Sequence, residues 1–302
     1  MLPVMAIPVG KREFDNLLRL LAAAKDEDLG AGDVTGGLLP ADLTAVARFV
    51  AREELVLCGG VFLPAVAEAY DAGIATELRV ADGQAATAGE VLARWSGPAR
   101  GILAAERVAL NFLQRLSGIA TTTAKYVAAA AGTGAAILDT RKTTPGWRDL
   151  EKYAVRCGGG RNHRRGLYDA VLVKDNHLAA LAVGGSPDAI AEIGRRLAEA
   201  RPRLGPDGFV EVEVDTLAQL AKVLKLPVDF VLLDNMPPAE LRRAVEMRDA
   251  AGLRGRVGLE ASGGVGLEAI GQIAAAGVER ISVGALTHSV RAADVALDVE
   301  FA

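Results

Sequence analysis

The chain has 302 residues, 51% of them hydrophobic and 24% charged, with a formal net charge of −4. This length allows one large domain or two ordinary ones. An aromatic content of 4% favours α/β packing over an all-β sandwich. The acidic balance argues against nucleic acid as the partner. Two cysteines without a CxxC spacing are typical of a reducing cytoplasm.

The N-terminal segment 1–14 lacks a basic start followed by a long apolar run, so we expect no signal peptide. No uncharged apolar stretch reaches about 18 residues, and we expect no membrane span.

Short strands and helices alternate in the first part of the chain. Apolar periodicity predicts helices at 14–24, 62–70 and 102–117, and strands at 44–50, 54–58, 76–80 and 91–99. An acidic, glycine-rich loop separates the first helix from the first strand. We therefore expect an N-terminal α/β sandwich domain over residues 1–120, with the C-terminal segment 289–302 packing back on it.

The rhythm then changes to repeated strand-then-helix units over residues 121–288. The expected strands are apolar runs, as in a parallel sheet that is buried on both faces, and they lie at 135–140, 170–175, 209–214, 230–235, 257–262 and 280–285. The expected helices lie at 148–156, 186–200, 216–225, 238–250 and 266–276. This pattern predicts a β/α barrel with fewer than eight strands. Polar residues gather where each strand ends, which is where barrel enzymes keep their active sites.

The segment 139–177 is the most basic part of the chain. It holds six arginines, three lysines, two histidines and the glycine triplet 158–160. Arginine forks match phosphate and carboxylate edges, and glycine lets the backbone approach them. The segment therefore indicates a compact polyanion as the ligand, although a solvated basic loop is an alternative. Cys157 has no evident general base beside it and is not expected to be a nucleophile.

Three sets of residues carry possible chemistry. The cationic set could hold a dicarboxylate or a diphosphate, although Lys174 could instead form a Schiff base; it comprises Arg141, Lys142, His163, Arg164 and Lys174. The acidic set, Glu213, Asp234 and Glu260, could bind Mg²⁺, bind sugar hydroxyls or stabilise a developing positive charge. Together the two sets favour glycosyl or phosphoribosyl transfer; a structural salt-bridge network is the alternative.

The third set consists of two glycine-containing loops, LEASGGV (259–265) and ISVGAL (281–286). In barrels such a pair of loops commonly binds phosphate through backbone N–H groups and a helix N-terminus; ordinary turns are the alternative. The spacing of His163, His177 and His288 matches no zinc motif, and His177 is expected to be a hydrogen-bonding residue at a strand end.

These motifs occur together in a known order. DTRKTTPG, KYAVRCGGGRNHRRGL, VKDNH, EVEVD, LLDN, LEASGGV and VGALTHS, preceded by EDLGAGDVT and AERVALNFLQRLSGIAT, resemble the quinolinate phosphoribosyltransferase family from about residue 26 to the end. The resemblance implies a type II phosphoribosyltransferase fold, with an N-terminal α/β sandwich and an incomplete, seven-stranded β/α barrel. It also implies a homodimer and the conversion of quinolinate and phosphoribosyl pyrophosphate to nicotinate mononucleotide, pyrophosphate and CO₂ in NAD biosynthesis, with Mg²⁺ as the cofactor.

The resemblance also implies residue roles. Arg141, His163 and Arg164 would hold the quinolinate carboxylates, and Arg107 would reach into the neighbouring subunit's site. Lys142 and Lys174 would act at the junction of quinolinate and pyrophosphate. Glu213 and Asp234 would bind the ribose, stabilise charge at its C1 and help to hold Mg²⁺. The remaining substrate contacts would be Thr140, Ser262, Gly263, Gly264, Val283, Gly284 and Ala285.

Two positions depart from the family's usual spelling: Arg161 and Arg165 add charge beside the expected site. A related branch associated with molybdenum-transport operons departs from the NHR and KDNH spellings, and both spellings are present here. The alternatives that remain are a paralogous phosphoribosyltransferase acting on another anionic heterocycle, a Schiff-base aldolase that uses Lys174, and a non-catalytic sensor of phosphorylated ligands.

Overall fold

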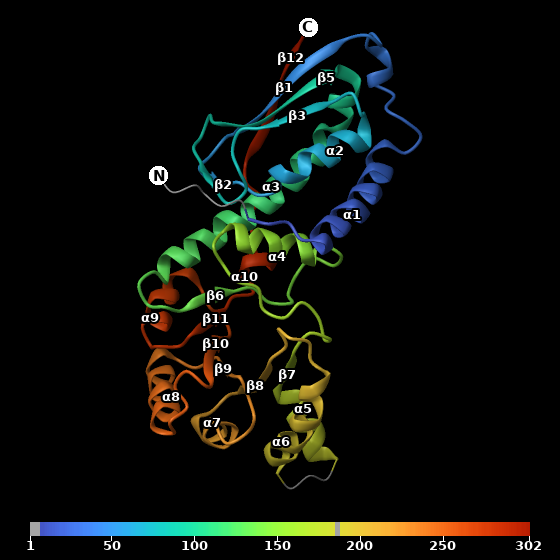
Figure 1. Cartoon of the computed structure of the whole chain (residues 1–302). Helices are drawn as coiled ribbons and strands as arrows, with labels where there is room; N and C mark the ends of the chain where they lie inside the picture. Colours follow the sequence, from blue (N-terminus) through green and yellow to red (C-terminus); the bar gives the residue numbers. More distant parts are fainter. Residues whose placement is uncertain (1–6, 185–187) are drawn as a thin grey trace. The chain divides into compact units, whose positions relative to one another are not determined.

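The computed structural model describes residues 7–184 and 188–302, which form two compact units. Unit 1 comprises the described residues up to Ala124 together with Lys142–Gly160 and Leu286–Ala302. Unit 2 comprises Lys125–Arg141 and Arg161–Ala285. Figure 1 shows the elements of both units along the chain.

Unit 1 is built on a four-stranded antiparallel sheet in the order β12-β1-β5-β3. Its strands are β1 (Thr44–Ala51), β3 (Ala75–Leu78), β5 (Val91–Pro98) and β12 (Val295–Phe301). Side chains alternate between the two faces of a strand, so Ala45, Ala47 and Phe49 of β1 all lie in the core. Phe49 meets Trp95 of β5 edge to face, with ring centroids 4.8 Å apart. A ribbon of β2 (Leu55–Val56) and β4 (Ala85–Ala86) accompanies this sheet.

The helices of unit 1 connect and cover these strands (Figure 1). They are α1 (Lys11–Leu29), α2 (Leu63–Tyr70), α3 (Ala99–Ala129), α4 (Arg148–Cys157) and α10 (Ala285–His288), with 3₁₀ turns at Gly36–Leu38 and Gly60–Phe62. α1 packs against α2 and α4, and α2 packs against β3. The last five residues of α3 and the first of α10 belong to unit 2.

Unit 2 is built on a six-stranded parallel sheet in the order β6-β11-β10-β9-β8-β7. Its strands are β6 (Ala136–Leu138), β7 (Val171–Val173), β8 (Val210–Val214), β9 (Phe230–Asp234), β10 (Gly258–Ser262) and β11 (Arg280–Ser282). Its helices are α5 (Asp175–Val183), α6 (Ala189–Ala200), α7 (Leu217–Val223), α8 (Pro238–Ala250) and α9 (Ile270–Ala274), with 3₁₀ turns at Arg201–Arg203 and Leu267–Ala269. Because the strands are parallel, their carboxyl ends meet at one edge.

The predicted α/β class and the strand-then-helix rhythm of unit 2 are confirmed. Among the described residues six strands pair in the parallel sheet, where the resemblance implied seven. Arg161 adds only a single isolated parallel bridge, to Leu138 at the free side of β6.

Several predicted elements have other bounds. The segment 280–285 is a strand only to Ser282, and 170–175 only from Val171 to Val173, because α5 begins at Asp175. The helix predicted at 102–117 runs from Ala99 to Ala129. Residues 186 and 187 of the helix predicted at 186–200 lie outside the described residues. Within the described part of the chain, no helix combines the length and apolar character that a membrane span requires.

Candidate active site

The carboxyl edge of the parallel sheet collects most of the candidate residues. Asp139–Arg141 follow β6, Lys174 follows β7, and Glu213 lies near the end of β8. Asp234 and Ser262 end β9 and β10, and 283–285 follow β11. The predicted clustering at one edge of the sheet is therefore present in unit 2.

The segment that leads to Arg164 is held at the end of β6 by a buried carboxylate. Asp139 is fully buried and accepts hydrogen bonds from the backbone N–H of His163, at 2.8 Å, and from the Asn162 side-chain amide, at 2.8 Å. The backbone N–H of Arg161 donates to the carbonyl of Ile137, at 2.8 Å. These contacts place the NHR segment directly beside the end of β6.

The charges of two arginines, Arg141 and Arg164, act on each other in this region. Arg164 is 8% exposed, and its Nη1 lies 3.4 Å from the carbonyl of Ala170. Burial lowers the pKa of Arg164, and the charge of Arg141 lowers it further. Because two like charges close together favour binding of an opposite charge, the pair is suited to an anion such as a carboxylate.

His163 is buried, and both of its ring nitrogens have protein partners. Nε2 lies 2.9 Å from Glu211 and 3.4 Å from Glu260, and Nδ1 accepts from the backbone N–H of Arg164 at 2.7 Å. Burial lowers the pKa of His163, but the hydrogen bonds to the two carboxylates outweigh it and raise the pKa to about 9. The carboxylates hold the proton on Nε2, and the ring can take a second proton on Nδ1 only when the Arg164 N–H gives up its contact with that nitrogen.

The two glutamates belong to a larger buried ion network. Arg280 lies 2.7 Å from Glu260, and its guanidinium covers the rings of Phe209 and Phe230. Burial raises the pKa of Glu211, and the charge of Glu260 raises it further. His163, Glu211 and Glu260 are close enough together to hold a metal ion. Since Arg280 and the Nε2 proton already balance the carboxylates, an ion network explains the cluster without a metal.

An ion pair lies further along the edge. Lys174 Nζ is 2.9 Å from Glu213 Oε2; the lysine is half exposed, whereas the glutamate is buried. The predicted cationic and acidic sets therefore touch at this point. The backbone N–H of Lys174 donates to Nδ1 of His177 at 2.9 Å, so His177 does form a hydrogen bond, but within the first turn of α5.

The loops after β9 and β10 pack tightly on each other. Asn235 adopts a left-handed φ of 54°, donates to Asp234 Oδ2 at 2.6 Å, and donates its backbone N–H to the carbonyl of Ser262 at 2.9 Å. Gly263 has a φ of 95°, and a Cβ there would lie 2.2 Å from Asn235 Oδ1. Only glycine fits this position, because the Asn235 side chain occupies the space that a Cβ would need.

The loop after β11 is anchored to β6. The backbone N–H of Val283 donates to the carbonyl of Leu138 at 2.9 Å, and Val283 is buried. Gly284 and Ala285 are partly exposed and lead into α10. The two glycine-containing loops therefore follow neighbouring strands, β10 and β11, of one sheet.

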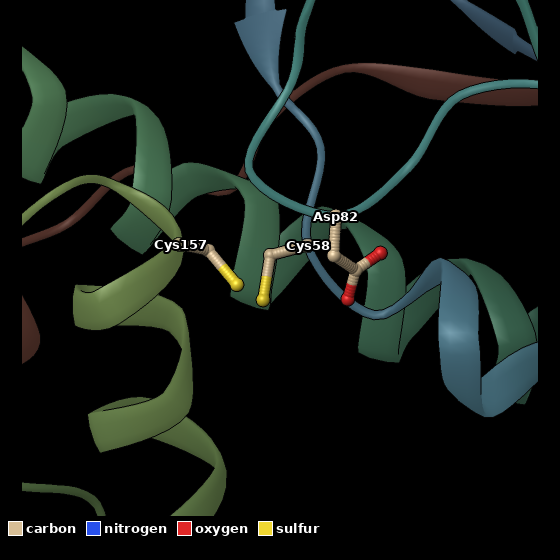
Figure 2. A group of neighbouring side chains, drawn as sticks. All are labelled: Cys58, Asp82 and Cys157. Carbon is tan, nitrogen blue, oxygen red and sulfur yellow. The ribbon is translucent and has the colours of Figure 1, made fainter. Parts of the chain in front are cut away.

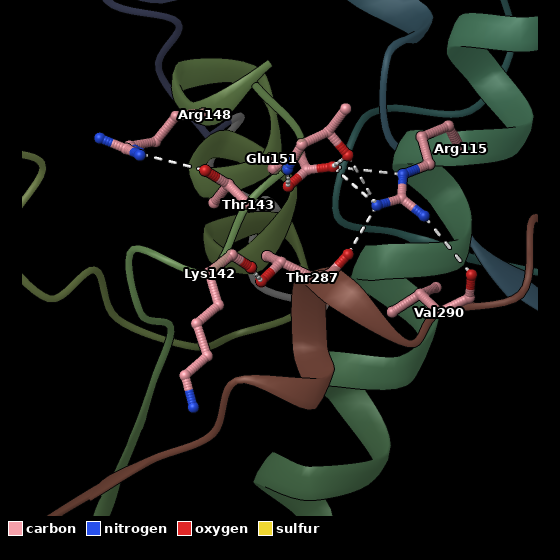
Figure 3. A network of polar contacts seen from close by, with 8 residues as sticks. Arg115, Lys142, Thr143, Arg148, Glu151, Thr287 and Val290 are labelled. Atoms are coloured by element: carbon pink, nitrogen blue, oxygen red, sulfur yellow. Dashed lines mark hydrogen bonds and ion pairs between the residues drawn. The ribbon is translucent and has the colours of Figure 1, made fainter. Parts of the chain in front are cut away.

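Two candidates belong to unit 1. Arg107 is an exposed residue of α3. Lys142 is exposed, and its backbone carbonyl accepts a hydrogen bond from Thr287 Oγ1 at 2.7 Å (Figure 3).

Cys157 lies beside the other cysteine of the chain, also in unit 1. Figure 2 shows the sulfur atoms of Cys58 and Cys157 turned toward each other, with Asp82 next to them. Both thiols are buried and free, and burial raises the pKa of Cys58. Asp82 accepts from the backbone N–H groups of Gly59 and Gly60 and from the Tyr153 hydroxyl. The cluster is therefore a core feature, in agreement with the expectation that Cys157 is not a nucleophile.

The glycine triplet has a packing role that the sequence did not indicate. A Cβ at Gly158 would lie 2.4 Å from the carbonyl of Ala120 in α3, and one at Gly160 would lie 2.8 Å from the Thr123 side chain. Close approach to α3, within unit 1, accounts for both glycines without a ligand.

Sequence reasoning did not identify Glu211 or Arg280. A signal was present for Glu211, because side chains two apart on a strand share a face and the alternation EVEV places Glu211 on the same side as Glu213. For Arg280, at the start of a short strand, no such pattern was available.

The comparisons with known proteins cover both units. Residues 33–117 match the N-terminal domain of quinolinate phosphoribosyl transferase, and residues 119–298 match its C-terminal domain. A nicotinate-nucleotide pyrophosphorylase (carboxylating) of Mycobacterium leprae is 43% identical over 95% of this chain and 98% of its own length. A probable enzyme of the same name from Bacillus subtilis is 40% identical over 90% of each chain. The solved nicotinate-nucleotide pyrophosphorylase of Francisella tularensis superposes with a TM-score of 0.87 at 38% identity, covering 97% of this chain and 98% of that one.

Proposed function

Because this chain belongs to the quinolinate phosphoribosyltransferase family, we propose that it performs the decarboxylating phosphoribosyl transfer of NAD biosynthesis. Quinolinate and phosphoribosyl pyrophosphate give nicotinate mononucleotide, pyrophosphate and CO₂. The observation that carries the proposal is a paired-arginine anion site, Arg141 and Arg164, on the same sheet edge as the Lys174–Glu213 ion pair. An anion-binding protein without ribosyl chemistry has no need for carboxylates there.

The transfer step uses both the carboxylates and the ammonium groups of the site. The pyridine nitrogen of quinolinate forms a bond to C1 of the ribose while the bond from C1 to pyrophosphate breaks. Positive charge develops on the ribose, and the carboxylates of Glu213 and Asp234 stabilise it. The ammonium groups of Lys142 and Lys174 stabilise the negative charge on the departing pyrophosphate.

The carboxylates of quinolinate are assigned to Arg141 and Arg164, with Thr140 and His163 beside them. His163 can contact a substrate carboxylate directly only by exchanging one of the protein partners of its ring nitrogens. After transfer, the bond between the ring carbon next to the nitrogen and its carboxylate group breaks, and CO₂ is released. The electron pair of that bond stays on the ring carbon, stabilised by the adjacent ring nitrogen, and that carbon then takes up a proton.

The 5-phosphate of the ribose is assigned to the two glycine-containing loops. Backbone N–H groups of a loop can donate to a phosphate where no Cβ intervenes. The open space at Gly264 supports this assignment, because nothing lies within 4 Å of the position that its Cβ would take. The expected contacts are Ser262, Gly263, Gly264, Val283, Gly284 and Ala285.

Mg²⁺ is the proposed cofactor. The partly exposed carboxylate of Asp234 is a hard oxygen ligand of the kind that Mg²⁺ prefers, and Glu213 is already paired with Lys174. These residues fit an ion that is held mainly by substrate phosphates, with Asp234 as a direct or water-mediated ligand. Bound in this way, the ion would supply charge neutralisation on the phosphates.

A homodimer is also proposed, in which Arg107 of one subunit completes the site of its partner. The exposure of Arg107 on α3 supports this. The two free thiols are consistent with a reducing cytoplasm, which we propose as the compartment.

The test is an assay of the purified protein with Mg²⁺, phosphoribosyl pyrophosphate and quinolinate that follows nicotinate mononucleotide and CO₂ together. We expect the two products in equal amounts, and none when Mg²⁺ is chelated. Phosphoribosyl pyrophosphate that binds without any product from quinolinate would overturn the proposal. A screen of other acidic heterocycles would then identify a paralogous transferase.

A further inference from the structure

The segment Lys142–Thr144 of unit 1 has neither helix nor strand structure, and side chains from elsewhere in the chain hold it. The carbonyl of Lys142 accepts from Thr287 Oγ1 at 2.7 Å. Thr143 Oγ1 accepts from Arg148 Nε at 3.0 Å. The backbone N–H and the hydroxyl of Thr144 donate to the two oxygens of Glu151, at 3.2 and 2.9 Å. All three consecutive residues are therefore fixed by side-chain hydrogen bonds.

The bonds of Lys142 and Thr144 lead to one buried ion pair. Glu151 in α4 is fully buried, and Arg115 in α3 donates to it at 2.7 Å. The same guanidinium donates to the carbonyl of Thr287 at 2.6 Å, and its other terminal nitrogen lies 3.4 Å from the carbonyl of Val290. Arg115 thus links α3, α4 and the segment after α10, as Figure 3 shows.

Burial of such an ion pair costs desolvation free energy. Removal of water from a carboxylate costs several kcal/mol, which ion pairing and further hydrogen bonds must offset. Here the offsetting donors are Arg115 and Thr144, so this loop in its present conformation supplies two of the hydrogen bonds to Glu151. A buried apolar contact at the same place would leave the loop free to adopt others.

The cluster contacts Lys142 at its backbone carbonyl. In Figure 3 the side chain of Lys142 extends away from the cluster, with its ammonium group far from Glu151. The contact from Thr287 is to the carbonyl oxygen and not to the ammonium group. The backbone is therefore fixed at the point from which this side chain departs.

We infer that Thr287, Glu151 and Arg115 are positioning residues that set the backbone of Lys142 for phosphoribosyl transfer. The inference rests on the proposed function, in which Lys142 stabilises the departing pyrophosphate. Misplacement of a reacting group by an ångström can cost about a hundredfold in rate. Loss of the Thr287 contact should therefore reduce kcat strongly, while the free energy of unfolding should change only as much as the loss of one hydrogen bond implies.

The first test compares Thr287→Val with Thr287→Ser and with Thr121→Val. Valine keeps the shape of Thr287 but removes the donor to the Lys142 carbonyl, whereas serine keeps the hydroxyl. Thr121 is a control within unit 1 but outside the loop; its hydroxyl donates to the carbonyl of Ser117 at 2.7 Å and accepts from the backbone N–H of Val56 at 2.8 Å. We expect Thr287→Val to lower kcat about tenfold or more, with Thr287→Ser and Thr121→Val near the wild-type value. Thr121→Val, which removes two hydrogen bonds, should lower Tm at least as much as Thr287→Val does.

The second test asks whether Thr287 acts through Lys142. In a Lys142→Ala background, Thr287→Val should have little further effect on kcat, because the group that it positions is gone. Equal fold-losses in both backgrounds would overturn the inference, as would a Thr287→Val enzyme with wild-type kcat. The wild-type assay separates the two claims: if wild type makes no nicotinate mononucleotide, the proposed function fails, and if wild type is active while Thr287→Val is unimpaired, only this inference fails.

Discussion

Arg164 is a residue whose position costs the unliganded protein energy. Burial and the neighbouring charge of Arg141 both lower the pKa of Arg164, so its charged form is disfavoured where it lies. A bound dicarboxylate would oppose these effects by adding negative charge to that of Asp169 and Glu211. The arrangement is therefore adapted to the complex more than to the free protein.

Arg164→Ala is expected to weaken quinolinate binding by about a hundredfold, since hydrogen bonds between charged groups are among the stronger ones. The free energy of unfolding should change little, because the charge that is lost was unfavourable. Calorimetric titration with quinolinate and chemical denaturation measure the two effects. An unchanged affinity would remove Arg164 from the carboxylate site.

Gly263 lies where the neighbouring residues and the backbone conformation leave no room for a side chain. A side chain there would meet Asn235 and would also require a left-handed backbone. We expect Gly263→Ala to destabilise the protein by about 1–3 kcal/mol and to raise KM for phosphoribosyl pyrophosphate.

Gly264→Ala is the comparison for Gly263→Ala, because Gly264 also has a positive φ, of 58°, but nothing lies within 4 Å of its Cβ position. Thermal unfolding and initial-rate kinetics on both variants separate crowding from backbone strain. Equal losses in the two variants would show that the contact with Asn235 is unimportant.

β8 shows, at the scale of an element, how one pattern serves two purposes. Its alternation places Glu211 and Glu213 on the same face. Glu213 pairs with Lys174 near the exposed end, and Glu211 pairs with His163 deeper in the unit. A single strand thus carries both a candidate catalytic carboxylate and a buried supporting one.

The buried pair makes a prediction about pH. With a pKa of about 9 in the folded state, above the usual 6.5, a protonated His163 stabilises the fold fully below pH 6.5, and this contribution is lost as pH rises toward 9. Glu211→Gln should lower the pKa of His163 and flatten this part of the stability curve. Because the chain has three histidines, NMR titration can follow His163 directly. A pKa that stays the same in Glu211→Gln would contradict the pairing.

The elements that sequence reasoning located best are those with a strong local pattern. The strands of unit 2 are apolar runs and were found, apart from their ends. The helix predicted to stop at Ser117 continues to Ala129, although Ser-Gly commonly ends a helix. A Cβ at Gly118 would lie 2.3 Å from the carbonyl of Arg291, so this glycine permits close packing within unit 1. That contact joins distant parts of the chain, and no local pattern reports it.

For the candidate site, too, local features could be predicted from the sequence and long-range contacts could not. Its motifs and their strand ends could be found from the sequence, because each lies within a few residues of an apolar run. The partners of those motifs could not, since Glu211 lies 48 positions from His163, and Arg115 lies 36 positions from Glu151. Which buried charge meets which is decided by the fold.

For the whole molecule, the proposed homodimer predicts complementation between defective subunits. If Arg107 serves the partner's site, a mixture of Arg107→Ala and Arg141→Ala subunits contains mixed dimers with one intact site. After the subunits exchange, activity should recover to about a quarter of wild type, because half of the dimers are mixed. Each variant alone should remain nearly inactive. A mixture that stays inactive after proven exchange would place Arg107 in its own subunit's site or outside the site.

The two cysteines give the folded protein a built-in reporter. Both are buried in the interior of unit 1, and they are the only thiols in the chain. A thiol reagent can therefore modify the protein only when this interior opens, and its rate at low reagent concentration measures the free energy of that opening. The free energy for opening of the core of unit 1 can thus be measured in the native enzyme, with or without substrates. No label has to be introduced.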